Sequence, residues 1–302
     1  MTRFRLGTRG SPLALTQAAM VRDALCLAHG WSADAVETVV IRTTGDRVQD
    51  RALAEIGGKA LWTKELDRAL HDGEIDCAVH SMKDVETIRP ETIRIAAMLP
   101  RADVRDRLIG AESIADLRQN AVVGTSSPRR RAQMLRLRPD LEIVLIRGNV
   151  DTRRGRVASG EMDATLLAAA GLDRLGQHDC GHAIPTDVML PAPAQGAVGI
   201  EVLGEGAAGA IVAAIDHAET SLCVLTERAL LARLGADCHS PVAALASLAG
   251  ETLTLRAELI AEDGRCDVTG SIEGGIDEDL GTALALDLLT RAPASVRLLF
   301  AA

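Results

Sequence analysis

Two stretches of the sequence open in the same way. The first reads "LGTRGSPLAL" from Leu6, and the second reads "VGTSSPRRRA" from Val123. Each runs from a strand-like segment through Gly-Thr to Ser-Pro, and Ser followed by Pro is typical of the N-cap and first position of a helix. A strand–turn–helix unit that recurs along one chain indicates two domains of related α/β design.

Both halves continue with alternating strands and helices. In the first half, hydrophobic patterns predict strands at residues 3–8, 35–46, 75–81 and 93–100, and helices at 11–30 and 59–74. In the second half they predict strands at 121–125, 141–149 and from 162, the last followed by a turn, and helices at 127–138 and 152–161. A further strand lies within residues 190–202, where "PAPA" suggests a hinge.

The last part of the chain has another pattern. A long helix is expected at residues 218–235, then strands at 243–249, 252–261 and 265–272, and a last helix at 277–292. This order is typical of a small α+β domain. The predicted domains are residues 1–99 with 196–216, residues 100–195, and residues 217–302.

Charge and hydropathy exclude several classes of protein. The formal net charge of −9 disfavours a general nucleic-acid binder. No window approaches the eighteen apolar residues of a membrane span, and the charged start "MTRFRLGTRG" lacks a signal-peptide core. We therefore expect a cytoplasmic protein without nucleic-acid or membrane partners. Its six scattered cysteines form no CxxC pair and are expected to be reduced.

A row of arginines follows the second Gly-Thr turn. Helix N-termini attract anions through their unpaired N–H groups, and the planar guanidinium of arginine suits carboxylates. The plain alternative is a solvated basic face. The place of Ser126, Ser127, Arg129 and Arg130 on a strand-to-helix turn favours a site for a ligand with several carboxylates. Arg9 and Ser11 occupy the matching place in the first half, and the two edges are expected to face a common cleft.

Other candidate groups are local. "VHSMKD" places Lys83 and Asp84 at a strand end, where a carboxylate beside a lysine keeps its charge, although a surface ion pair is the simpler interpretation. "HDCGH" offers half of a metal site, and with no second cluster a polar loop is the better interpretation. Cys238 lies in the turn "LGADCHSPV", and the neighbouring His239 also admits a Cys-His nucleophile.

Taken together, these segments resemble the porphobilinogen deaminase (hydroxymethylbilane synthase) family over nearly the whole chain. The motifs that carry the resemblance are "GTRGSPLAL", "IGGKALWTKEL", "AVHSMKD", "VGTSSPRRR", "IRGNVDTR", "AAAGLDRLG", "PAPAQGAVGIE" and "GADCHSP". The resemblance implies two type II periplasmic-binding-protein-like α/β domains plus a small α+β C-terminal domain. It also implies a monomeric transferase of haem and tetrapyrrole biosynthesis. Its reaction joins four porphobilinogen molecules head to tail into hydroxymethylbilane and releases four ammonia molecules, on a covalent dipyrromethane cofactor.

The resemblance also implies roles for single residues. Cys238 is the expected attachment point of dipyrromethane, through a thioether, and Asp84 is the expected catalytic residue. Further cofactor contacts, among which Asp84 also counts, are expected from Lys83, Ser81, Thr125, Ser127, Arg129, Arg130, Arg147, Gly148 and Asn149. Substrate contacts are expected from Arg9, Ser11, Lys59, Trp62, Ser126, Arg153 and Gln195. No metal is expected.

A few positions depart from the family pattern. Glu55 stands where several relatives have lysine, and Glu86 and Val104 stand where proline is common. They put loop geometry and hinge stiffness in question, but none removes an expected catalytic group. A small-anion binding module without catalysis is the alternative class, and a Cys-dependent hydrolase is a more distant one. Cys238 distinguishes the deaminase family from the binding module, because a pure binder needs no covalent anchor.

Overall fold

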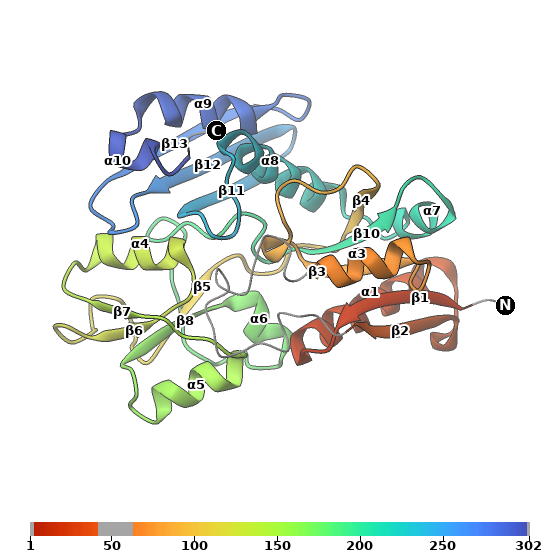
Figure 1. Ribbon diagram of the computed structural model, residues 1–302, viewed down its shortest axis with the longest axis horizontal. Helices are drawn as coiled ribbons and strands as arrows, with labels where there is room; N and C mark the ends of the chain where they lie inside the picture. Colours follow the sequence, from red (N-terminus) through yellow and green to blue (C-terminus); the bar gives the residue numbers. More distant parts are fainter. Residues whose placement is uncertain (1–2, 42–62, 301–302) are drawn as a thin grey trace. The chain divides into compact units, whose positions relative to one another are not determined.

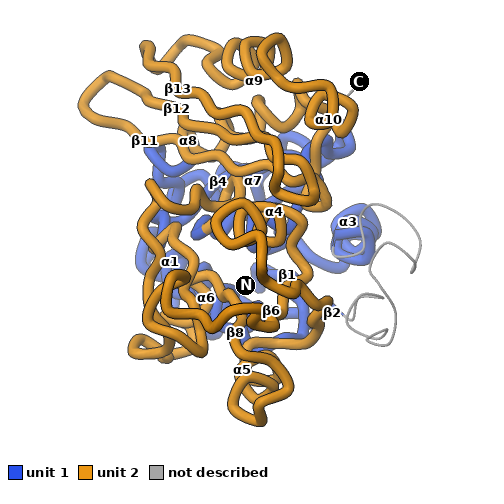
Figure 2. Tube along the Cα trace, turned by 90° about the vertical axis from the view of Figure 1, so that its left-hand side faces the viewer, with its two compact units in different colours: residues 1–102, 196–221 blue, residues 103–195, 222–302 orange. Residues whose placement is uncertain are grey.

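The computed structural model describes residues 3–41 and 63–300 of the chain. The chain divides into two compact units, which Figure 2 shows in separate colours. Unit 1 holds residues 1–102 and 196–221, and unit 2 holds residues 103–195 and 222–302. The predicted crossings near residues 100 and 196 lie close to these boundaries, while the division into three domains stays a prediction.

Unit 1 is built on a five-stranded sheet in the order β2-β1-β3-β10-β4 (Figure 1). Its strands are β1 (Phe4–Arg9), β2 (Val36–Ile41), β3 (Cys77–Ser81), β4 (Ile93–Met98) and β10 (Val198–Leu203). β1 pairs in parallel with β2 and β3, whereas β10 runs antiparallel to both of its neighbours. The carboxyl ends of β1 and β3 therefore meet at one edge, and the predicted residues Arg9 and Ser81 end these two strands.

Helices cover both faces of this sheet. α1 (Pro12–His29) packs Val21 and Leu25 into the same core as Val79, and α3 (Lys64–His71) packs Leu66 and Leu70 against Ala78. Because side chains alternate along a strand, Val79 and Ala78 must face opposite sides. A 3-10 turn (η1, Ala33–Ala35) leads into β2, and α7 (Ala207–Ala213) follows β10.

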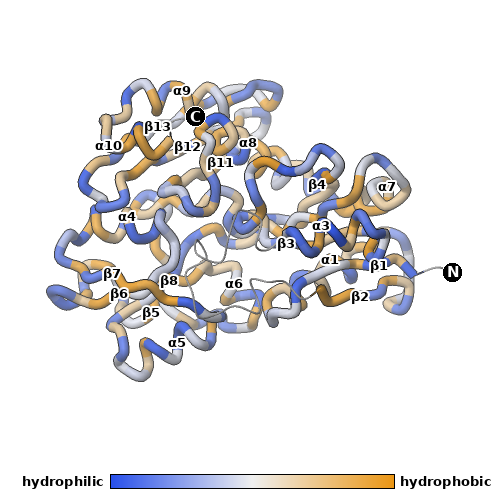
Figure 3. Tube along the Cα trace, in the orientation of Figure 1, coloured by the Kyte–Doolittle hydropathy of each residue, from blue (hydrophilic) through white to orange (hydrophobic). Residues whose placement is uncertain are grey.

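Unit 2 contains a second five-stranded sheet, in the order β7-β6-β8-β5-β9. Its strands are β5 (Asp106–Ile109), β6 (Val122–Gly124), β7 (Glu142–Val144), β8 (Ala164–Ala168) and β9 (His182–Ala183). Its helices are α4 (Pro128–Leu137), α5 (Val150–Ala158) and α6 (Ala169–Arg174). α5 is hydrophilic along most of its length in Figure 3, and none of its residues is buried.

The two five-stranded sheets share one plan. In each, the strand before the Ser-Pro helix lies between two parallel neighbours, and a single antiparallel strand separates the third strand from the edge strand. The antiparallel strand comes last along the chain in unit 1 (β10) and first in unit 2 (β5). The matching halves predicted from the repeated opening are thus present as matching sheets, and the predicted mixed α/β class is confirmed.

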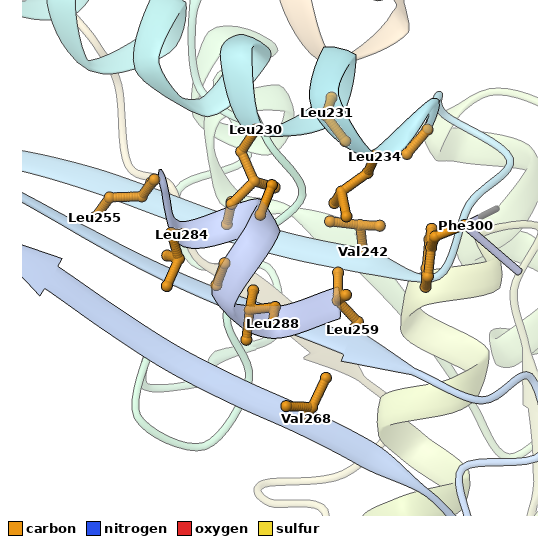
Figure 4. Close-up of a cluster of buried hydrophobic side chains, with 14 of the residues drawn as sticks. Leu230, Leu231, Leu234, Val242, Leu255, Leu259, Val268, Leu284, Leu288 and Phe300 are labelled. Atoms are coloured by element: carbon orange, nitrogen blue, oxygen red, sulfur yellow. The ribbon is translucent and has the colours of Figure 1, made fainter. Parts of the chain in front are cut away.

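A three-stranded antiparallel sheet completes unit 2. It joins β11 (Val242–Ala249), β12 (Thr252–Ile260) and β13 (Asp267–Gly275) in that order. In Figure 4, leucines of α8 (Ala218–Leu234) and α9 (Leu280–Arg291) meet the sheet in one apolar cluster, with Phe300 at its margin. On the other side, buried Gln133 of α4 donates through Nε2 to Glu258 Oε2 of β12 at 2.8 Å.

Several elements differ from the sequence-based expectations. Residues 169–174 form helix α6 rather than a turn, and the strand expected over 141–149 ends at Val144. β5, β9, α7 and the short α10 (Ala294–Arg297) were not predicted. All four are short, so none shows the repeated apolar spacing on which such predictions depend.

No single helix within residues 3–41 and 63–300 is long and apolar enough to cross a membrane. α7 and α8 meet the length and composition criteria only as a bent pair.

Candidate active site

The β1–α1 turn brings two predicted residues together in unit 1. Arg9 ends β1, and Ser11 is the N-cap of α1, with Oγ accepting a hydrogen bond from the Ala14 N–H at 3.3 Å. Pro12 occupies the first helical turn, as the Ser-Pro pair predicts. At the neighbouring strand end, buried Gln17 donates through Nε2 to Ser81 Oγ at 2.8 Å. α1 and β3 are thus joined at the edge where the site was expected.

Asp84 shares a pocket with these residues. It belongs to the 3-10 turn η3 (Met82–Asp84) directly after β3, and it is half-buried. Arg9, Ser11, Gln17, Ser81 and Asp84 all line a pocket of about 70 Å³. Ligand pockets usually measure about 300–1,000 Å³, so this one admits a single group of a ligand, such as a carboxylate or the edge of a ring.

The segment that follows Asp84 along the chain contributes to a buried ionic cluster around Arg89. Arg89 donates through Nε and Nη2 to Glu201 of β10 at 2.8 and 2.9 Å, and through Nη1 to Glu86 at 2.8 Å. His80 Nε2 lies 3.2 Å from Glu201 Oε2. Although burial opposes it, the His80 imidazole and the Arg89 guanidinium hold the pKa of Glu201 at about 2. Glu201 therefore stays charged inside the unit.

In unit 2 the Thr-Ser-Ser turn is fixed by hydrogen bonds. The Thr125 N–H donates to the Val144 carbonyl at 3.0 Å, and the Ser127 N–H donates to Thr125 Oγ1 at 3.2 Å. Ser127 is the N-cap of α4 and accepts from the Arg130 N–H. The local structure is therefore the one that the Ser-Pro motif predicts.

Arg129 and Arg130 point into the protein. They are only 2% and 6% exposed, and both donate to the buried carboxylate of Asp106 on β5, at 2.8 and 2.7 Å. Although burial opposes it, these two guanidinium groups hold the pKa of Asp106 well below its usual range. The Nε atoms of both arginines are buried without a hydrogen-bond partner among the described residues. Their role as carboxylate ligands stays a prediction.

Gln195 joins the same cluster. It is 1% exposed, and its Nε2 donates to Asp106 Oδ1 at 2.9 Å and to the Val104 carbonyl at 2.8 Å. Val104, where the resemblance led us to expect proline, accepts this bond at its carbonyl. The sequence predicts that Gln195 contacts the substrate. In the structure it is the last residue of the unit 2 segment 103–195, directly before the chain returns to unit 1.

A second group of predicted residues gathers at the start of α5. Asn149 caps the helix by accepting from the Thr152 N–H at 2.9 Å. Arg153 donates to the Gly148 carbonyl at 3.0 Å and to Ser126 Oγ at 3.3 Å. Gly148 has φ of 107°, and a Cβ there would lie 2.7 Å from Thr152 Cγ2, so only glycine fits. Nη2 of Arg147 is buried and has no partner within the described ranges.

Cys238 differs from the other cysteines by its exposure. It is exposed, whereas Cys77 and Cys223 are buried and Cys26, Cys180 and Cys266 are intermediate. Its turn is closed by the Asp237 N–H donating to Ser240 Oγ at 3.1 Å and the His239 N–H donating to Asp237 Oδ1 at 2.9 Å. Burial raises the pKa of the Cys77 thiol and so disfavours the reactive thiolate there.

Some expectations cannot be placed, and two residues were missed. Lys59, Trp62 and Glu55 lie outside the described residues, and so do Leu61 and the start of the helix expected from residue 59. Gln17 and Asp106 were not predicted from the sequence. No local signal marked Asp106, because the four-residue strand that it opens was itself not predicted.

The described ranges hold no group of three or more His, Cys, Asp or Glu side chains that could bind a metal ion. In "HDCGH", His182 begins β9, and the exposed His178 lies 3.3 Å from Asp173. The segment therefore contributes to the sheet edge and to a surface ion pair.

Comparison with known proteins identifies the family. Residues 4–208 match the family model described as porphobilinogen deaminase, dipyromethane cofactor binding domain, and residues 221–290 match its C-terminal domain. The chain belongs to the porphobilinogen deaminase family. It is accordingly an enzyme of tetrapyrrole biosynthesis that polymerises porphobilinogen, and it carries the family's cofactor-binding domain. The resemblance drawn from the sequence motifs is confirmed.

Two curated relatives extend over almost the same length. The chain is 56% identical to a porphobilinogen deaminase from Sphingopyxis alaskensis, over 99% of this chain and 96% of that protein. It is 51% identical to the one from Paracoccus denitrificans, over 96% and 95%. Among solved structures it is similar to the methionine binding protein MetQ, with 11% identity and a TM-score of 0.44 over 72% of this chain and 92% of that one.

The residues present suit a dipyrromethane cofactor with acidic side chains. Three buried guanidinium nitrogens, on Arg129, Arg130 and Arg147, have no partner among the described residues, and carboxylates are the natural acceptors for such donors. The thiol of Cys238, which the sequence predicts as the attachment point, is exposed. All four residues were predicted from the sequence as cofactor contacts.

Proposed function

We propose that Cys238 carries the dipyrromethane cofactor and that Asp84 is the catalytic carboxylate for the condensation of four porphobilinogen molecules into hydroxymethylbilane. The observation that carries the proposal is the exposure of Cys238 in an ordered turn of a family member whose matched domain binds this cofactor. A binding module without catalysis does not account for membership of this family.

The arginines and turn donors have a common task in this proposal. When bound, dipyrromethane supplies the pyrrole carbon to which the first substrate is joined. Arg129, Arg130 and Arg147 hold its carboxylates, with Lys83, Ser81, Thr125, Ser127, Gly148 and Asn149 as further contacts. The substrate is bound by Arg9, Ser11, Ser126, Arg153 and Gln195, and by Lys59 and Trp62, which lie outside the described residues.

Asp84 acts on developing charge. When the aminomethyl group of porphobilinogen loses ammonia, positive charge spreads onto the pyrrole nitrogen. An ionised Asp84 accepts a hydrogen bond from that N–H group, and the bond strengthens as the charge grows. This preferential stabilisation of the transition state raises the rate. After the new carbon–carbon bond forms, the pyrrole carbon that attacked must lose its proton, and Asp84 assists that transfer.

The proposal also includes the location, oligomeric state and partners of the enzyme. We propose a cytoplasmic monomer that binds porphobilinogen and neither nucleic acid nor a membrane. None of the six cysteines, all of which lie within the described residues, forms a disulfide in the structure, as in proteins of reducing compartments. The acidic balance of the chain disfavours nucleic acid.

Single-turnover kinetics of Asp84→Asn test the catalytic role. The substitution keeps size and an acceptor oxygen but removes the charge, so the condensation rate should fall about 10²–10³-fold while porphobilinogen still binds. The exposed Asp23→Asn is the matched control and should condense substrate at the wild-type rate. If Asp84→Asn condensed bound substrate at the wild-type rate and only bound it weakly, the assignment would be wrong.

A further inference from the structure

Arg89 stands at the centre of three carboxylates that come from different parts of unit 1. Its guanidinium donates to Glu201 of β10 at 2.8 and 2.9 Å, to Asp67 of α3 at 2.5 Å, and to Glu86 at 2.8 Å. The Arg89 side chain is only 9% exposed, and that of Glu201 is fully buried. We call Arg89 with these three acids the Arg89 cluster.

The cluster ties the segment that follows Asp84 to its surroundings. Glu86, two positions after Asp84, also accepts from Thr63 Oγ1 at 2.8 Å, immediately before α3. On the other side of Asp84, the Met82 N–H donates to the Ala197 carbonyl at 3.1 Å. The turn that holds Asp84 is therefore anchored just before it and just after it.

The composition of the cluster indicates a role in positioning as well as in stability. One guanidinium faces three acids, so their mutual repulsion is only partly relieved. Burial raises the pKa of Asp67, opposed by its bond to Arg89. Buried ion pairs often stabilise no better than apolar residues of the same volume, because removing charges from water is costly. The planar guanidinium, however, fixes the direction of each of its hydrogen bonds.

We propose that Arg89 is a positioning residue for Asp84, acting through Glu86 and the anchored turn. The inference deepens the proposed function and rests on the catalytic role of Asp84. A displacement of about 1 Å at a reacting group can cost about 100-fold in rate, so an anchor at this distance along the chain is sufficient to control turnover.

A double-mutant cycle between Arg89 and Asp84 tests the inference, because it separates positioning from a general structural effect. Holoenzymes carrying Arg89→Met, Asp84→Asn and both changes are compared by single-turnover rate, KM and melting temperature. Arg89→Met should lower the rate about 10–100-fold with little change in KM. In the Asp84→Asn background, Arg89→Met should lower the remaining single-turnover rate by less than about twofold. Arg89→Lys keeps the charge but not the planar guanidinium, so its single-turnover rate should lie between those of the wild type and Arg89→Met.

Controls keep the outcomes distinct. Arg68→Met, on the same helix as Asp67 and 81% exposed, should leave rate and KM unchanged. If Arg89→Met does not fold, Glu86→Gln, which keeps the shape of the tether, enters the same cycle. Rate losses that multiply in the double variant, or no loss in the single variant, would overturn the positioning role while leaving Asp84 catalytic. A wild-type rate for Asp84→Asn alone would instead overturn the proposed function.

Discussion

Asp106 receives hydrogen bonds from three side chains that the sequence assigned to ligands. Arg129, Arg130 and Gln195 all donate to this one buried carboxylate, at 2.7–2.9 Å. The arginines in the first turn of α4 are therefore not one solvated face. Arg129 and Arg130 turn inward, whereas Arg131 is exposed. The Ser-Pro motif predicts where these residues start a helix, but their direction depends on an acid from a strand that is distant in sequence.

Leucine substitutions at Arg130 and Arg131 should therefore have unequal effects. Arg130→Leu removes a charged hydrogen bond from Asp106 and another to the Leu166 carbonyl, and should lower the free energy of unfolding by about 1.5–3 kcal/mol. It should also reduce cofactor or substrate loading. Arg131→Leu should change stability by less than about 0.5 kcal/mol. Urea unfolding and porphobilinogen consumption measure both effects, and equal results for the two variants would count against this account.

Among the elements, the long helices and the strands of the central sheets follow from the sequence. α1 is predicted at both ends, because Ser11 and Pro12 begin it and Gly30, with φ of 64°, ends it. β5 is not predictable in this way, since four residues carry no period and its place depends on pairing with β8 and β9. In the site, the motifs predict candidate residues and the helix starts that hold them, but Asp106 and the Arg89 cluster depend on tertiary contacts that local patterns do not encode.

Glu201 of strand β10 leads to a prediction about the free energy of unfolding in acid. Glu201 has a folded-state pKa of about 2, below its ordinary 4.5, so its ion pairs stabilise the fold fully above about pH 4.5 and are lost as the pH falls toward 2. Glu201→Gln leaves Arg89 and His80 without this partner and should cost about 3–5 kcal/mol at pH 7.

The stability gap between the wild type and Glu201→Gln should narrow as the pH falls below 4.5, because the wild type then loses the same ion pairs. Urea unfolding at pH values from 7 to about 3 measures it. The exposed Glu37→Gln on the edge strand β2 is the control and should track the wild type throughout. A gap that stayed constant with pH would show that the charge of Glu201 is not what stabilises the unit.

At the scale of the whole molecule, the residues of the proposed site are distributed over both units. Asp84, Arg9 and Ser11 belong to unit 1, whereas Cys238 and the arginines around Asp106 belong to unit 2. The repeated opening of the sequence thus marks two anion-suited turns, and the turn with the exposed cysteine belongs to neither. In the proposed function these parts would serve a cofactor-primed polymerisation as a covalent anchor, as carboxylate-binding turns, and as a separate acid at the reacting group.

The intact mass of the purified protein tests this account most directly. The wild-type protein should exceed its sequence mass by two porphobilinogen units less two ammonia molecules, and Cys266→Ala, at a less exposed cysteine of the same unit, should keep that addition. Cys238→Ala should fold, show the bare sequence mass and turn over almost no porphobilinogen. An unchanged addition and full activity in Cys238→Ala would contradict the account.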